Sequence, residues 1–225
     1  MNILIVIPTR FEARFLLDGF DGSKEELVRP FSFLKHTIHP FICGTGPVAC
    51  AASTAAILQN QHFDLVINAG IAGSYLLDLA PGSLVHITSE CLPEFGEMNP
   101  KKCIFTPIHQ MSFDASLPDF YSSETLVNPF AENYELPESI IKVKGATVIG
   151  LDYSRNFYKS TAASVETMEG AAFFFACLLS SVPFLQLRAI SNYTGIKGKT
   201  AWEAESALNK LATALHAFIS NLTNE

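Results

Sequence analysis

The sequence predicts an α/β domain in three layers, in which a central sheet lies between two layers of helices. Short apolar segments recur along the 225 residues, and most are followed by small or turn-forming residues and then by a helical pattern. Strand followed by helix, repeated along a chain, is typical of α/β folds. Apolar residues make up 48% of the chain, enough to fill one substantial core. We therefore expect residues 1–225 to form a single domain.

Six segments are predicted strands because their apolar residues run almost without interruption, as in strands that are covered on both faces. They are Asn2–Pro8, a segment that ends at Phe41–Gly44, Asp64–Ala69, Ser83–Thr88, Ala146–Ile149 and Phe184–Ile190.

Three segments are predicted helices. Pro47 follows Gly44-Thr45-Gly46 and opens an alanine-rich stretch over residues 47–59, where a proline in the first turn loses no hydrogen bond. Residues 165–181 are apolar nearly all round, which is typical of a buried helix. In residues 204–222 the apolar positions alternate steps of four and three, so this helix is expected to be amphipathic.

Composition excludes several classes of protein. The net charge is −7 with only 15 Lys and Arg, whereas a nucleic-acid surface needs a basic stripe. The sequence has no uncharged apolar run of about 18 residues, so we expect no membrane span. The five cysteines have no C-x-x-C spacing and form no ligand-spaced cluster with the histidines, so we expect reduced thiols, a cytoplasmic location and no metal or cofactor. Residues 91–140, with six prolines and little periodicity, are expected to form an insertion or a lid.

Four segments with candidate functional residues lie at or just beyond the ends of predicted strands, where open α/β sheets bind ligands. They are Arg10-Phe11-Glu12-Ala13, Gly44-Thr45-Gly46-Pro47, Asn68-Ala69-Gly70-Ile71-Ala72-Gly73, and the pair formed by Glu166–Ala172 and Arg188–Asn192. The second segment lacks the third glycine of a dinucleotide-binding fingerprint, so a tight turn before a helix is its simpler interpretation.

Each candidate also has a purely structural interpretation. Glu169 lies in the most apolar stretch of the chain, where burying a carboxylate is costly unless it has a specific partner. That partner is either a substrate or Arg188, in a structural ion pair. Glu12 alone is compatible with a solvated carboxylate at a helix start. Gly70–Gly73 is compatible with a loop that needs positive φ and close backbone approach. Asn192 is compatible with a strand-end turn residue.

Taken together and in order, Glu12, the N-A-G-I-A-G run, the M-E-G-A-A run and the R-A-I-S-N run resemble the nucleoside phosphorylase/nucleosidase superfamily. The similarity covers most of the chain apart from residues 91–140. It is strongest to the hydrolase branch, the methylthioadenosine/S-adenosylhomocysteine nucleosidases and above all the futalosine hydrolases. The resemblance implies a three-layer α/β/α fold with a central twisted mixed sheet, a small nucleoside substrate and a homodimer or larger homo-oligomer.

Departures from the superfamily pattern favour hydrolysis over phosphorolysis. Phosphorylases of this superfamily carry a G-D-P-x-R loop after the first strand and an arginine at the position of Asn68, and both hold phosphate. Here that loop reads Pro8-Thr9-Arg10-Phe11-Glu12, and Asn68 is uncharged. The two-arginine clamp is missing, so water is the expected nucleophile. A purine nucleoside phosphorylase and a non-catalytic nucleotide-binding protein remain alternatives.

The resemblance also implies roles for individual residues. Glu12 accepts a proton from the attacking water, and Arg188 orients that water and the nearby carboxylates. Glu169 accepts hydrogen bonds from the ribose 2′- and 3′-hydroxyls, and Met168 packs against the ribose. The backbone of Ala72 and Gly73 runs close to the substrate.

Asn192, which follows Ser191 in the R-A-I-S-N run, stands where adenosine-type nucleosidases carry an aspartic acid that protonates purine N7. An amide delivers no proton, but its NH₂ group can donate to N7 and O6 of a 6-oxopurine. The run therefore favours futalosine, which releases hypoxanthine, over methylthioadenosine or adenosylhomocysteine, which release adenine.

The remaining parts of a futalosine pocket are expected from aromatic and basic residues. Apolar walls for the 5′ arm are predicted from Phe11, Phe95, Phe105 and Phe113, and a counter-charge for its carboxylate from Arg10 or Arg14. Superfamily nucleosidases also stack a phenylalanine on the purine, and the matching loop, Leu151–Ser160, offers Tyr153, Phe157 and Tyr158.

Overall fold

The computed structural model describes residues 1–20, 28–99, 104–107, 125–150, 162–195 and 203–223. Its strands are β1 (Asn2–Ile7), β2 (Phe31–Phe33), β3 (His36–Ile42), β4 (Leu65–Ser74), β5 (Leu84–Cys91), β6 (Gly96–Asn99), β7 (Ile104–Pro107), β8 (Leu126–Val127), β9 (Ile140–Thr147), β10 (Val165–Thr167) and β11 (Phe184–Tyr193). Its helices are α1 (Arg10–Leu16), α2 (Pro47–Asn60), α4 (Gly170–Ser180) and α5 (Ala204–Asn221).

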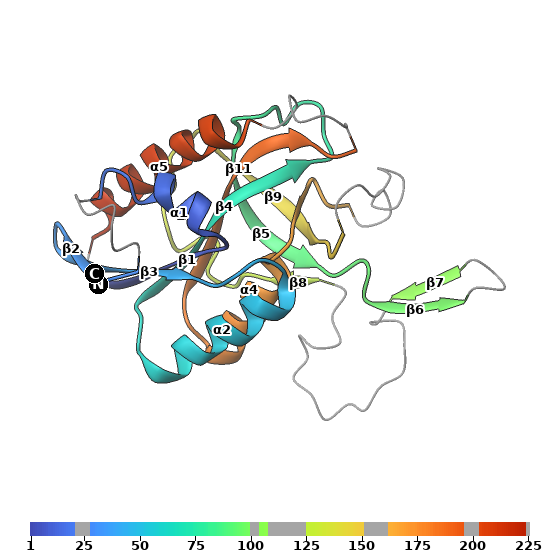
Figure 1. Cartoon of the computed structure of the whole chain (residues 1–225), viewed down its shortest axis with the longest axis horizontal. Helices are drawn as coiled ribbons and strands as arrows, with labels where there is room; N and C mark the ends of the chain where they lie inside the picture. The colour runs from blue at the N-terminus through green and yellow to red at the C-terminus, as the bar shows by residue number, and fades with distance from the viewer. Residues whose placement is uncertain (21–27, 100–103, 108–124, 151–161, 196–202, 224–225) are drawn as a thin grey trace.

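A mixed sheet forms the middle layer of the fold. Its strand order in the described residues is β10-β9-β5-β11-β4-β1-β3-β2, with β8 paired to β5. Helices α1 and α5 cover one face of the sheet, and α2 and α4 cover the other (Figure 1). The three-layer α/β/α prediction is therefore confirmed. A separate two-stranded sheet, β6-β7, extends away from these layers (Figure 1).

Strand β1 explains why the first predicted strand is apolar at every position. Ile3, Ile5 and Ile7 pack toward α1 and α5, whereas Leu4 and Val6 pack toward α2 and α4. All five side chains have no exposed surface. Successive side chains of a strand point to opposite faces, so a strand covered on both faces has no position for a polar residue.

The long strands β4 and β11 lie side by side and parallel at the centre of the sheet, and they carry most of the candidate residues. Leu185, Leu187 and Ala189 of β11 pack into the core under α1 and α5. Gln186 and Arg188 alternate with them and so point to the other face. At the far end of β4, strand β10 pairs antiparallel with Gly73 and Ser74 and also runs beside β9. The sheet therefore curls over the end of β4.

The predicted helix over residues 165–181 is wrong in its first part. Residues 165–167 form strand β10, and the helix α4 begins only at Gly170. Val165 and most of α4 are equally buried. A segment that is apolar all round does not distinguish a buried strand from a buried helix, which is the reason for the error.

Three predicted strands are too short, and one is misplaced; the strand predicted at Ser83–Thr88 is β5, which continues to Cys91. β4 continues to Ser74 and β11 to Tyr193, so the segments assigned to the space beyond their ends are strand residues. The strand predicted at 146–149 is β9 at 140–147. Lys142 and Lys144 are exposed on β9 and break the apolar run that was used to find strands. The expected irregular region 91–140 contains β6, β7 and β8 within its described parts.

The cysteines within the described residues are free thiols, and Cys43, Cys50 and Cys177 are buried. Cys103 lies outside the described residues. None of the helices in the described ranges combines the length and the apolar character that a membrane crossing requires.

The burial of His86 contributes a loss of stability at acid pH. It is fully buried on β5, and neither ring nitrogen has a hydrogen-bond partner among the described residues. Burial, assisted by the charge of Lys142, lowers its pKa from 6.5 to about 4. The unfolded chain therefore binds the proton more readily, and stability is lost as the pH falls from 6.5 through 4.

We expect His86→Met to remove this acid-dependent loss of stability, which amounts to about 3 kcal/mol of unfolding free energy once the pH is near the lowered pKa of His86. Urea unfolding of both proteins at about pH 7, 5.5 and 4.5 measures it. The comparison must be between the two proteins, because Glu12 and Glu90 have raised pKa values and favour folding as the pH falls. A difference in stability that does not change with pH would contradict the prediction.

Candidate active site

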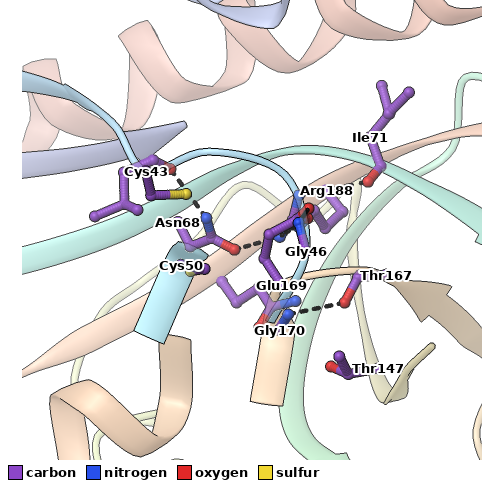
Figure 2. Close-up of polar contacts among 12 residues, drawn as sticks. Cys43, Gly46, Cys50, Asn68, Ile71, Thr147, Thr167, Glu169, Gly170 and Arg188 are labelled. Atoms are coloured by element: carbon purple, nitrogen blue, oxygen red, sulfur yellow. Dashed lines mark hydrogen bonds and ion pairs between the residues drawn. The ribbon is translucent and has the colours of Figure 1, made fainter. Parts of the chain in front are cut away.

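Arg188 lies at the centre of the candidate site, on β11, with no exposed surface. Its Nη2 donates to Oδ1 of Asn68, and its Nη1 donates to the carbonyl oxygen of Ile71 at 3.5 Å. Oε2 of Glu169 lies 3.8 Å from Nη2 (Figure 2). A buried guanidinium is costly unless charge and hydrogen bonds compensate it, and these partners supply both.

Glu12 reaches the same place from helix α1. Thr9 is the N-cap of that helix, and its Oγ1 accepts from the backbone N–H of Glu12 at 3.1 Å. The Thr9 hydroxyl in turn donates to Oε2 of Glu12 at 2.6 Å, and the N–H of Ile71 donates to Oε1 at 3.1 Å. Burial raises the pKa of Glu12, while the Thr9 hydrogen bond and the charge of Arg188 oppose the rise. The carboxylate is held firmly in a place where it binds a proton more readily than usual.

Gly70 provides the room in which Glu12 and Arg188 meet. A Cβ atom there would lie 2.4 Å from Nη1 of Arg188 and 2.7 Å from Oε1 of Glu12. Neither Gly70 nor Gly73 has a positive φ, and both lie within β4. The interpretation of Gly70–Gly73 as a loop with positive φ is therefore wrong, and close approach explains the glycine at position 70.

Glu169 lies at the N-terminus of α4 and points away from its own helix. As N-cap it makes no side-chain bond to the helix, and it is 4% exposed. Its Oε1 accepts instead from the backbone N–H of Gly46 at 2.9 Å (Figure 2). Gly46 is the N-cap of α2, so the positive end of that helix also faces the carboxylate.

The Gly44-Thr45-Gly46-Pro47 segment is thus a turn before a helix and also a contact of Glu169. Gly44 and Gly46 have φ of 86° and 87°, values that residues other than glycine rarely adopt. The ion pair between Glu169 and Arg188, the structural alternative for Glu169, is present. The Gly46 N–H donates to the carboxylate that also pairs with Arg188, so the ion pair is one part of a larger site.

The other candidate residues lie further along β4 and β11. Asn192 pairs with Gly73 across a bulge, and both are buried. Oγ of Ser191 lies 2.7 Å from Oδ1 of Asn192 and 3.3 Å from the carbonyl oxygen of Ala72. Asn192 is a strand residue, so its interpretation as a strand-end turn residue is wrong.

Met168 lies between β10 and α4, half-buried, directly before Glu169. Gly73 faces crowded surroundings, since a Cβ there would lie 2.8 Å from Oγ1 of Thr194 and 3.1 Å from Glu166. The structure brings Glu12, Glu169 and Arg188 into one cluster and places Ala72, Gly73, Ser191 and Asn192 beside each other at the adjacent strand ends.

Some residues expected in a substrate pocket are not placed by the structure. Tyr153, Phe157, Tyr158 and Phe113 lie outside the described residues, and the side chain of Phe105 is also outside them. Phe11 and Phe95 are exposed, as are Arg10 and Arg14 on α1. In the described ranges, three or more His, Cys, Asp or Glu side chains are nowhere grouped so that they could hold a metal ion.

Sequence reasoning missed three contributors to the site. The N–H of Gly46 holds Glu169, and no side-chain pattern reveals a backbone donor. Thr9 holds Glu12, and the spacing Thr-x-x-Glu is a capping pattern that predicts such a pair. The third is a buried carboxylate, Glu90, which is 0% exposed and bonded to Thr147, Thr167 and Gln186.

Comparison with known proteins identifies relatives along almost the whole chain. A profile of the family described as "Phosphorylase superfamily" matches residues 2–224. The futalosine hydrolase of Thermus thermophilus is 27% identical over 96% of this chain and 95% of its own length. The futalosine hydrolase of Streptomyces coelicolor is 28% identical, with 96% and 94% covered. The 5′-methylthioadenosine/S-adenosylhomocysteine nucleosidase of Maridesulfovibrio salexigens is 25% identical over 99% of both chains.

Solved structures of the same fold include both kinds of enzyme. A futalosine hydrolase mutant of Helicobacter pylori has a TM-score of 0.76 at 18% identity, covering 99% of this chain and 100% of that one. A mutant of the methylthioadenosine nucleosidase from the same organism, with 5′-methylthioadenosine in its active site, has a TM-score of 0.77 at 18% identity, with 98% and 99% covered. At this identity the similarity establishes the fold.

The space at Gly70 yields a test of the cluster. In Gly70→Ala the added methyl group overlaps Nη1 of Arg188 and Oε1 of Glu12, so both side chains must move. Because both are tied to several partners, we expect the unfolding free energy to fall by about 2 kcal/mol, as in overpacked cores. Urea unfolding measures the change, and a loss below about 0.5 kcal/mol would contradict the tight contact.

Proposed function

The chain belongs to the phosphorylase superfamily, and on that basis we propose that it is an N-ribosyl hydrolase that cleaves the glycosidic bond of a purine nucleoside. The observation that supports this most strongly is the meeting of Glu12 and Glu169 at Arg188. Two fixed carboxylates beside one cation suit a reaction in which water is deprotonated while a sugar gains positive charge.

Asn68 favours water over phosphate as the nucleophile. Its Oδ1 accepts from Arg188 and its Nδ2 donates to the carbonyl oxygen of Val6 at 3.0 Å. The amide is buried, uncharged and occupied by these two partners. It therefore offers no cationic donor for a phosphate dianion, which typically binds to arginine or lysine.

Glu12 is proposed as the general base. A base works best when its pKa approaches the working pH, and burial shifts Glu12 in that direction. One of its oxygens accepts from Thr9 and the other from Ile71, so the carboxylate keeps one orientation. A water bound to it is presented to the sugar from a fixed point, which lowers the entropic part of the barrier.

Glu169 is proposed to hold the ribose diol and to stabilise its developing positive charge. Its carboxylate is tied down by the Gly46 N–H and by Arg188, and it has further lone pairs for two hydroxyl groups. Preorganised charge in a buried site stabilises a transition state without the cost of reorienting solvent. Met168, the preceding residue, is proposed to pack on the sugar.

Futalosine is the substrate that we propose, with hypoxanthine as the released base and methylthioadenosine or adenosylhomocysteine as the alternative. The hydroxyl of Ser191 donates to Oδ1 of Asn192, which directs the Nδ2 donors away from Ser191. A donor suits N7 and O6 of hypoxanthine, both acceptors, better than the 6-amino group of adenine. Curated relatives with both activities match the chain, the futalosine hydrolases at slightly higher identity.

A chromatographic assay of purified protein with futalosine, with and without phosphate, tests the reaction. We expect hypoxanthine release at the same rate in both conditions. Glu12→Gln and Glu169→Gln should each lower kcat by roughly 10²-fold or more, because each removes a charge that acts in the transition state. Glu138→Gln changes an exposed glutamate in the same way and should leave the rate unchanged. A requirement for phosphate would refute the hydrolase assignment.

Asn192→Asp tests the choice of base. An aspartic acid can protonate N7 and accept from the 6-amino group of adenine, so we expect kcat/KM for methylthioadenosine to rise relative to that for futalosine by roughly tenfold or more. Parallel assays of both substrates on both proteins measure the ratio. If the ratio does not change, Asn192 does not contact the base.

A further inference from the structure

We propose that Glu90 is a positioning residue whose buried carboxylate holds the turn that carries Glu169 into the active site. This inference rests on the proposed function, because it concerns the placement of the residue assigned to the ribose. Glu90 is assigned no part in the chemistry, since its hydrogen bonds go to Gln186 and to two threonines. Its effect on Glu169 passes through those threonines.

The carboxylate of Glu90 is fully buried, and both of its oxygens accept hydrogen bonds. Oε1 accepts from Nε2 of Gln186 at 2.9 Å and from Oγ1 of Thr167 at 3.3 Å. Oε2 accepts from Oγ1 of Thr147 at 3.0 Å. These donors come from β11, β10 and β9, so one side chain of β5 joins three other strands. A buried carboxylate with this many donors is held in one geometry.

The two threonines pass this constraint to helix α4. Oγ1 of Thr167 accepts from the N–H of Gly170 at 3.0 Å, and Oγ1 of Thr147 accepts from the N–H of Ala171 at 2.6 Å. Figure 2 shows both threonines beside the start of this helix, next to Glu169. The hydroxyl of each threonine donates its one hydrogen to Glu90, so the lone pairs of the hydroxyl oxygen are directed to the N–H groups of the helix.

This arrangement explains why Glu169 does not cap its own helix. The N-cap side chain usually accepts from the first N–H groups of its helix. Here Thr147 and Thr167 perform that role, which leaves the Glu169 carboxylate for Gly46 and Arg188. If the threonine hydroxyls were not oriented by Glu90, the Glu169 carboxylate would compete for the same N–H groups.

Two glycines show how closely Glu90 packs against this turn. A Cβ atom at Gly170 would lie 1.8 Å from Oε1 of Glu90, and a Cβ atom at Gly145 would lie 2.6 Å from the same oxygen. Gly170 directly follows Glu169, so the carboxylate touches the backbone whose position it is proposed to set.

The charge of Glu90 is sensitive to pH. Burial raises its pKa to about 7, against the hydrogen bonds from Gln186, Thr147 and Thr167 and the charge of Arg188. Arg188 is the charged group that faces it from β11. Helix α4 and strand β8 carry no charged residue, Lys142 and Lys144 of β9 are exposed, and Glu166 of β10 bonds to Tyr75. On protonation one oxygen becomes a donor, so at least one of the three hydrogen bonds is lost or reverses its direction.

The test uses Glu90→Gln, which has the size of glutamate and the hydrogen-bonding pattern of its protonated form. At alkaline pH we expect kcat for hypoxanthine release to fall roughly 10²-fold, because the Glu169 carboxylate is then held in the wrong position. The change in KM should be smaller. At acid pH the two proteins should converge, because Glu90 is then protonated in the wild type. A purely structural role predicts the same activity ratio at every pH.

Thr167→Val and Thr167→Ser keep the proposal testable if Glu90→Gln does not fold. Valine removes the hydroxyl, while serine keeps it, so we expect activity to fall in the first and to remain near wild type in the second. Thermal unfolding of every variant separates loss of fold from loss of placement.

The outcomes distinguish the two proposals. If the wild-type protein releases no base from any purine nucleoside, the proposed function fails. If it does release the base, and the ratio of wild type to Glu90→Gln does not change with pH, or Thr167→Val retains full activity, the role of Glu90 is refuted.

Discussion

The site depends on a single buried cation. Arg188 has no exposed surface, and a guanidinium in that position requires acceptors and negative charge around it. Asn68 and Ile71 supply neutral acceptors, and Glu169 supplies charge at 3.8 Å. The same cation lowers the pKa values of Glu12 and Glu90 against the effect of burial. Arg188 therefore offsets part of the cost of burying three carboxylates that come from separate parts of the chain.

Glycines make room for the charged side chains of this cluster. Gly70 lies under Glu12 and Arg188, and Gly170 lies against Glu90. A methyl group at either position would occupy the space of a charged atom. The glycines of this site therefore act mainly by the absence of a side chain, whereas Gly44 and Gly46 are needed for their backbone conformation.

Helix termini provide the second organising constraint. Glu169 stands at the start of α4 and faces the start of α2, so the N–H of Gly46 holds its carboxylate from outside its own helix. The N–H groups left free at the start of α4 are taken by threonines of two strands. The first contact ties α4 to α2 and the second ties α4 to the sheet, so the Glu169 carboxylate is placed by its neighbours as much as by its own helix.

The layer order and the acidic and amide residues of the candidate site could be predicted from the amino-acid sequence, whereas their contacts could not. The unbroken apolar run of β1 predicts a strand with two covered faces, and Ile3–Ile7 are covered in that way. Glu169 stands out because a carboxylate in an apolar stretch needs a partner.

By contrast, the division of residues 165–181 into β10 and α4 depends on the pairing of Val165 with β4 and β9. The N–H of Gly46 lies 123 residues from Glu169 along the chain, and Gln186 lies 96 residues from Glu90. The hydrophobic pattern of each segment and the cost of burying a charge can be inferred from the sequence. Contacts between residues so far apart are set by strand register, and a backbone N–H donor has no signature in the sequence.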